Sequence, residues 1–175
     1  TAKGVTLTHI PAMGARGLNT NDVALDNVEI PLADVIGGEE GWNQGWPRLV
    51  GPALEVEKLE VAAMALGIAA QAVDDAWDYS QQRSQFGQRI CSHQSIRHML
   101  ADAQTKLAAA RLMLYRGCWF ADNNLPCSVE TSMAKMFASE TGLYIVLTCQ
   151  KVMGAYGYAK GFDMERYVRD MLLMP

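Results

Sequence analysis

The sequence predicts a mainly α-helical protein, a four-helix up-and-down bundle preceded by a short β segment. Three observations predict this fold. Apolar residues recur at helical spacing from about residue 43 onward, the links between the helical stretches are short, and only residues 1–36 carry the alternation typical of strands. Half of the 175 residues are apolar, which is enough for one sizeable core. Long helices joined by short links fold up and down.

The β segment consists of two runs, residues 4–10 and 22–30, separated by Pro11, Gly14 and Gly17. Proline and glycine interrupt regular structure, so each run is expected to be a separate strand. A glycine-rich stretch, residues 37–41, then marks a domain boundary. We therefore expect a boundary between a β segment, residues 1–36, and a helical domain, residues 37–175.

The predicted helices cover about residues 43–50, 52–82, 92–123 and 129–152, and a short last helix follows Asp163. Gly51 and Pro52 predict a break between the first two, because proline is best tolerated in the first turn of a helix. Ser92 is the predicted N-cap of the next helix. That helix places one apolar stripe toward the core, formed by Ile96, Leu100, Ala103, Leu107, Ala110 and Leu114.

Composition argues against several classes of function. The net charge is −4 and no run of Lys or Arg occurs, so we expect no binding to nucleic acid or to an anionic membrane. No apolar run reaches the length of a membrane span, and no signal peptide is visible. The four cysteines show no Cys-x-x-Cys spacing, which predicts reduced thiols and a cytoplasmic protein. The three histidines form no ligand set with them, so no metal site is predicted.

Arg83 and Phe86 lie where the second long helix ends, and Gln94 begins the next one. A guanidinium can bind a diphosphate and an aromatic ring can stack on a purine, so the pair is a candidate nucleotide site. The simpler interpretation is a cation favoured by the helix dipole and a ring that plugs the turn before Gly87. From these residues alone, the simpler interpretation is favoured.

Glu57 is the candidate catalytic base. On a helix it continues an apolar stripe, whereas Glu60 lies on a polar face with Gln71 and Asp74. A carboxylate that loses hydration has a raised pKa and can take a proton from carbon. The alternative is a glutamate at the bundle end that pairs with Lys58 or with another subunit.

The loop Gly154-Ala155-Tyr156-Gly157-Tyr158 follows a helix and contains small residues that let backbone amides approach a phosphate. Lys151, three residues before it, could reach a diphosphate. A plain glycine-rich helix stop is the alternative.

Four segments together resemble the acyl-CoA dehydrogenase family. In addition, residues 22–37 resemble the last strand of its middle β-domain and the exit to its helical domain, which implies that residues 1–36 are the end of that β-domain. The run from Tyr79 to Gly87 resembles a helix end of that family, and residues 154–158 look like its Gly-Gly-Tyr-Gly-Tyr loop. Residues 165–170 are similar to its Glu-Arg-x-x-Arg-Asp segment, and residues 54–63 to its Leu-Asp-x-Glu-Arg-x-x-x-Ala-Ala segment. The chain departs from the family at Lys58, where arginine is usual, and at Lys151, where glutamine is usual.

The resemblance implies an FAD-dependent enzyme that introduces a double bond between the α and β carbons of an acyl-CoA. Glu57 would take the α-proton while the β-hydrogen passes as hydride to the flavin. Cofactor contacts would come from Arg83, Phe86, Gln94, Lys151, Gly154 and Ala155, with Arg83 and Phe86 holding the adenosine diphosphate half of an FAD bound mainly by a neighbouring subunit. Family members are commonly homotetramers, dimers of dimers, that pass electrons to an electron-transfer flavoprotein.

Three alternatives stay open. The chain could be a non-catalytic helical partner that supports FAD binding and assembly, or an oxidase or monooxygenase relative in which the flavin reacts with oxygen. Other family members place the base in a loop that would lie three residues beyond Pro175. The chain starts with Thr1 rather than Met, and we expect a piece of a longer polypeptide that is inactive alone.

Overall fold

The computed structural model describes residues 2–175, apart from the side chain of Pro52. It divides into two compact units, of which the first ends at Leu54 and the second covers Glu55–Pro175. We describe each unit by itself. The boundary expected between residues 36 and 37 stays a prediction.

The first unit contains an antiparallel strand pair, β1 (Val5–His9) and β2 (Asn21–Leu25). Two single-turn 3₁₀ helices follow, Leu32–Asp34 and Glu39–Gly41. Both predicted strands are confirmed, but the second ends at Leu25. The reason is Asn27, whose positive φ of 47° belongs to a turn and is tolerated by asparagine better than by most residues.

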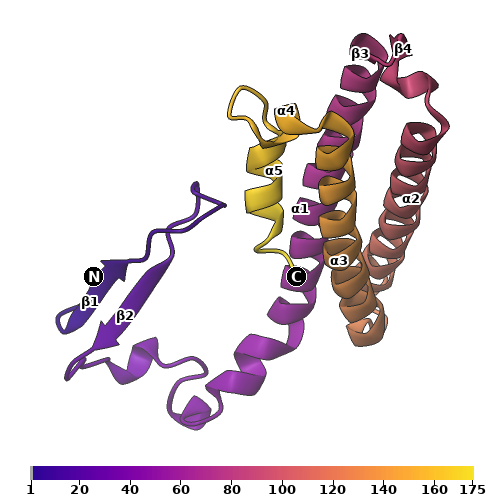
Figure 1. Cartoon of the computed structure of the whole chain (residues 1–175). Coiled ribbons are helices and arrows are strands. Elements are labelled where there is room, and N and C mark those ends of the chain that lie inside the picture. The colour runs from indigo at the N-terminus through magenta and orange to yellow at the C-terminus, as the bar shows by residue number, and fades with distance from the viewer. Residues whose placement is uncertain (1) are drawn as a thin grey trace. The chain divides into compact units, whose positions relative to one another are not determined.

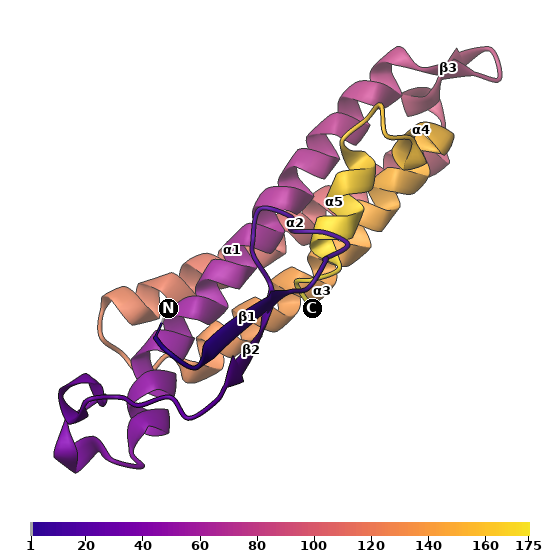
Figure 2. The same cartoon turned by 90° about the vertical axis from the view of Figure 1, so that its left-hand side faces the viewer.

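The second unit is built on three long helices that run alongside one another (Figures 1 and 2): α1 (Gly45–Gln82) from Glu55 onward, α2 (Gln94–Asp122) and α3 (Ser128–Met153). α2 is antiparallel to α1 and to α3, as the colours along the chain in Figure 1 show. The short helices α4 (Ala155–Tyr158) and α5 (Met164–Met171) complete the bundle, with α5 packed on α3. The predicted mainly helical fold is confirmed. Three of the bundle helices are long, and the short α5 takes the fourth position.

Two predicted helix boundaries are wrong. Gly51 and Pro52 do not break the first helix, because α1 is continuous from Gly45 to Gln82. A proline inside a helix removes one hydrogen bond and favours a kink, yet the helix can continue beyond it. Ser92 is not an N-cap, since it ends a short 3₁₀ helix (Ile90–Ser92) and the N-cap of α2 is His93.

The core lies between the long helices and is lined with small residues where α1 meets its neighbours. Ile145, Met164 and Met171 are among its largest fully buried side chains. Cys149 is buried with them, and all four cysteines are free. The stripe predicted on α2 is confirmed from Leu100 to Leu114. Close helix contact is allowed by alanines of α1 that are fully buried: Ala62, Ala65, Ala69, Ala72 and Ala76.

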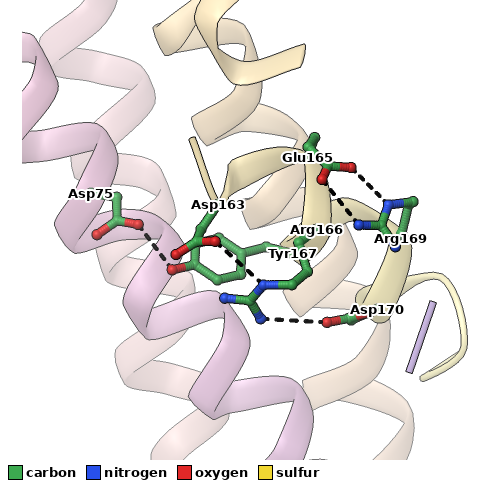
Figure 3. A network of polar contacts seen from close by, with 7 residues as sticks. All are labelled: Asp75, Asp163, Glu165, Arg166, Tyr167, Arg169 and Asp170. Carbon is green, nitrogen blue, oxygen red and sulfur yellow. Dashed lines mark hydrogen bonds and ion pairs between the residues drawn. The ribbon is translucent and has the colours of Figure 1, made fainter. Parts of the chain in front are cut away.

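A polar network surrounds α5 (Figure 3). Arg166 pairs with Asp163 at 3.4 Å and with Asp170 at 3.6 Å, and the side chain of Arg169 donates to Glu165 at 2.7 Å. These pairs join residues of α5 to one another or to Asp163, the N-cap of α5, so they stabilise the helix itself. The hydroxyl of Tyr167 donates to Asp75 at 3.0 Å and connects α5 to α1.

Tyr167 is buried, and its hydroxyl group should make stability depend on alkaline pH. Burial, followed by the hydrogen bond to Asp75, raises its pKa to about 12. Because the folded state holds this proton more tightly, the stabilisation is full below the ordinary tyrosine pKa of about 10 and is lost as pH rises toward 12. Tyr167→Phe should therefore lower the free energy of unfolding by about 1 kcal/mol at neutral pH.

Urea unfolding at about pH 8 and about pH 11 tests this prediction. The variant should lose less stability between the two pH values than the parent chain does. Tyr115→Phe is the control, since Tyr115 is 61% exposed on α2. An alkaline loss of the same size in the parent chain and in Tyr167→Phe would contradict the prediction.

Candidate functional site

The end of α1 leads into a tight hairpin that presents Phe86 to solvent. Strand β3 (Ser84–Gln85) pairs with β4 (Gln88–Arg89), and the two residues between them have positive φ angles, 54° at Phe86 and 79° at Gly87. A two-residue turn of this kind suits glycine and strains a bulky residue. The Phe86 side chain is 91% exposed, so it does not plug the turn as the simpler interpretation supposed.

Exposure and backbone strain at the same residue are both unfavourable for the isolated chain. Such strain is typical of sites where a ligand or partner uses the side chain. The geometry of Phe86 therefore makes it a candidate binding residue.

Arg83, just before the hairpin, contacts the loop that follows α3. Its guanidinium carbon Cζ lies 5.4 Å from the centroid of the Tyr156 ring, a cation–π distance. Tyr156 belongs to the glycine-rich loop predicted from the sequence, and α4 and the hairpin lie at the same end of the bundle (Figures 1 and 2). Sequence reasoning quoted Tyr156 within that loop but gave it no role.

His93 supports the hairpin from the start of α2. Its ring nitrogen Nε2 lies 3.3 Å from the carbonyl oxygen of Gln85, and Nδ1 lies 3.2 Å from the side-chain nitrogen of Gln88. The Phe86 and His93 rings meet edge-on, with centroids 6.1 Å apart. Gln94, the next predicted site residue, is exposed at the first position of α2. The sequence analysis gave His93 no role, because the hairpin that it contacts was not predicted; only its position directly before Gln94 was apparent.

The remaining predicted cofactor residues lie where α3 ends. Lys151 is exposed in the last turn of α3, and Ala155 is exposed at the start of α4. Gly154 caps α3 with a φ of 60°, and an added Cβ there would meet no atom within 4 Å. Open space beside this backbone leaves room for a ligand to approach it.

Gly157 has the opposite environment. It is buried against α3, and an added Cβ would lie 2.7 Å from the carbonyl oxygen of Gln150. The loop therefore packs on the end of α3 at a distance that excludes any side chain, which fixes its position.

The structure does not bury Glu57. Glu57 and Glu60 are both exposed on α1, so the expectation that position on the helix would separate their environments is wrong for this chain. Part of the apolar stripe that begins at Glu57 is itself open, because Met64 is 44% exposed and the neighbouring Val56 is 52% exposed. Helical spacing identifies a face but does not show whether a neighbour covers all of it.

Glu55 is the carboxylate that contacts the bundle. It accepts hydrogen bonds from the Thr131 hydroxyl on α3 and from Lys58 at 3.1 Å. Chiefly the bond from Thr131, with help from Lys58, lowers its pKa below the ordinary value. Lys58 also donates to Ser132 at 3.1 Å, so this lysine contacts Glu55 and Ser132 and is not paired with Glu57.

Other features of the described residues lie away from these positions. A cavity of about 540 Å³ opens between α1 and α2, and it is lined by Val73, Asp74, Trp77, Arg97, Leu100, Ala101 and Gln104, none of them a predicted site residue. Within residues 2–175, no helix has both the length and the apolar character needed to cross a membrane. The same residues contain no group of three or more His, Cys, Asp or Glu placed to hold a metal ion.

Comparison with known proteins gives consistent results. The family model for the C-terminal domain of acyl-CoA dehydrogenases matches residues 43–175. The chain is 38% identical over 159 residues to an acyl-CoA dehydrogenase of Bacillus subtilis, covering 90% of this chain and 41% of that protein. It is 37% identical over 158 residues to the caffeyl-CoA reductase-Etf complex subunit CarC of Acetobacterium woodii, covering 90% of this chain and 41% of that protein.

The structure of butyryl-CoA dehydrogenase from Megasphaera elsdenii matches 99% of this chain and 44% of that chain, with a TM-score of 0.90 and 31% identity. The chain thus spans less than half the length of the relatives it matches. The match to the family model over residues 43–175 and the agreement in fold lead to one conclusion: the chain belongs to the acyl-CoA dehydrogenase family and contains its C-terminal domain.

Proposed function

We propose that this chain is the C-terminal part of an FAD-dependent acyl-CoA dehydrogenase that acts on the α and β carbons of an acyl-CoA thioester. The observation that carries the proposal is Phe86, an exposed aromatic residue on a strained turn, three residues after the exposed Arg83. Family membership supports the reaction class.

The hairpin end of the bundle fits the adenosine diphosphate half of FAD. Arg83 supplies a cation for the diphosphate, and the free face of the Phe86 ring can stack on adenine. Gln94 adds an amide at the start of α2, while Lys151, Gly154 and Ala155 offer a second cation and an open backbone. Because these groups are exposed in the single chain, they are available to an FAD held mainly by a neighbouring subunit.

Glu57 is proposed as the base that removes the α-proton. Its carboxylate is exposed here, but it follows the open Val56 in the chain and shares a helix face with the open Met64, two turns further along α1. An acyl chain or a protein segment that covers these residues would also remove water from Glu57 and raise its basicity. Bound FAD supplies the hydride acceptor for the β-hydrogen.

The proposal includes assembly and partners. Exposed apolar side chains along α2 and α3 support a homotetramer built as a dimer of dimers: Leu112, Tyr115, Trp119, Val129 and Met136. The printed name of the Acetobacterium woodii relative includes an Etf complex, which supports an electron-transfer flavoprotein as the electron acceptor. Four free thiols support a cytoplasmic location. This chain alone should neither hold FAD tightly nor turn over acyl-CoA.

Phe86→Ala in the complete enzyme tests the cofactor proposal. Loss of the stacking ring should weaken FAD binding about tenfold. The thermal stability of the FAD-free protein should not fall, because the ring is 91% exposed. Equilibrium titration of the apoenzyme with FAD measures the affinity.

Phe86→Tyr is the matched control, since it keeps the aromatic face and should bind FAD as the parent does. An FAD affinity that is unchanged in Phe86→Ala would remove the observation on which the proposed function depends.

A further inference from the structure

Two aromatic residues support the exposed ends of the proposed nucleotide site. The guanidinium of Arg83 lies over the ring of Tyr156, and the rings of His93 and Phe86 meet nearly at a right angle. Each of them contacts one of the two side chains that would bind the nucleotide.

Tyr156 is held in place by its own neighbours. Its ring centroid lies 6.0 Å from that of Tyr79 on α1 and 5.5 Å from that of Phe162, and the Tyr79 and Phe162 centroids are 6.1 Å apart. The three rings form an aromatic cluster whose position depends on α1 and on the chain between α4 and α5. The buried Gly157 fixes the same loop against α3.

Arg83 needs such support. An exposed arginine samples many rotamers, and ordering it on binding costs conformational entropy. A cation less than about 6 Å from a ring centroid is attracted to the ring face, and the 5.4 Å distance from Arg83 to Tyr156 lies in this range. The guanidinium is thereby held over the ring before any ligand arrives.

His93 acts on Phe86 through the hairpin. Its two ring nitrogens contact residues on either side of the turn, Gln85 and Gln88. The His93 ring meets the Phe86 ring at an interplanar angle of 85°, and Phe86 stays 91% exposed, so most of the surface of its ring is open. The imidazole thus holds the strained turn while leaving the stacking surface free.

We propose that Tyr156 and His93 are positioning residues that hold Arg83 and Phe86 in the orientation that receives the adenosine diphosphate half of FAD. This inference rests on the proposed function, because it concerns the same cofactor site. Under this inference, the glycine-rich loop and the N-cap of α2 contribute to cofactor binding indirectly, by holding the side chains that contact the cofactor.

Double-mutant cycles on FAD affinity test the inference in the complete enzyme. Tyr156→Leu should weaken FAD binding about three- to fivefold when Arg83 is present. It should have no further effect in an Arg83→Ala background, because the residue through which it acts is gone. His93→Leu should behave in the same way toward Phe86→Ala.

Tyr156→Phe is the matched control, because phenylalanine keeps the ring face and should retain affinity. A second measurement covers the case in which Tyr156→Leu does not fold. Pentafluorophenylalanine at position 156 keeps the ring shape but removes the negative ring face, and it should weaken FAD binding only while Arg83 is present.

The outcomes separate the two proposals. If Arg83→Ala and Phe86→Ala weaken FAD binding but the Tyr156 and His93 variants are equally harmful in those backgrounds, the positioning inference is wrong and the proposed function stands. If Arg83→Ala and Phe86→Ala leave FAD affinity unchanged, both fall. Loss of the Tyr156 and His93 effects in the two alanine backgrounds supports the inference.

Discussion

Replacement of Glu57 by glutamine in the complete enzyme should slow exchange of the α-proton of an acyl-CoA by about 10²- to 10⁴-fold. Glutamine keeps the size and polarity of the side chain but cannot accept the proton. Exchange of the α-hydrogen with deuterated water, followed by mass spectrometry, measures this step without hydride transfer. The variant should still bind FAD, because Glu57 lies on α1 outside the proposed cofactor contacts.

Glu60→Gln is the matched control, since it makes the same change on an exposed residue of the same helix. It should leave exchange unchanged. The stability of Glu57→Gln should equal that of the parent chain, whereas Glu55→Gln should be less stable because Glu55 accepts bonds from Thr131 and Lys58. An undiminished exchange rate in Glu57→Gln would exclude it as the base and favour either a base outside this chain or a non-catalytic helical subunit.

Gly157→Ala should lower the free energy of unfolding by about 2 to 3 kcal/mol. The added Cβ would lie 2.7 Å from the carbonyl oxygen of Gln150 and 3.1 Å from its Cα, and backbone atoms cannot turn aside as a flexible side chain can. The loop that carries Tyr156 must then move away from α3. Urea unfolding of the parent and variant chains measures the loss.

Gly161→Ala provides the control for this substitution. An added Cβ at Gly161 meets no atom within 4 Å, and the residue does not need a positive φ, so the change should be nearly neutral. Equal stabilities for Gly157→Ala and Gly161→Ala would show that the loop is not packed against α3 as described.

Much of the fold follows from periodicity. The stripe on α2 was predictable because each of its residues repeats at helical spacing, and burial from Leu100 to Leu114 confirms it. The continuity of α1 through Gly51 and Pro52 was not predictable. Local preference identifies a weak point in a helix but does not show whether the helix continues beyond it. Asn27 similarly ended β2 through a backbone angle that alternation does not reveal.

The candidate site was only partly predictable. Composition at the helix end identified Arg83 and Phe86 as chemically suitable, yet the positive φ of Phe86 and its exposure come from the hairpin geometry. The contact between Arg83 and Tyr156 joins segments far apart in the sequence, so no local pattern contains it. For Glu57, the pattern identified an apolar face but not how much of it the chain itself covers.

The buried Cys149 makes the bundle suited to measurements of local opening. Desolvation is the main reason that its pKa is raised to about 12, so almost none of it is thiolate at neutral pH. An alkylating reagent would react with this sulfur only in molecules whose helices have separated. Because all four cysteines are free, no disulfide holds the helices together, and the rate at which Cys149 is labelled measures how often the bundle opens locally.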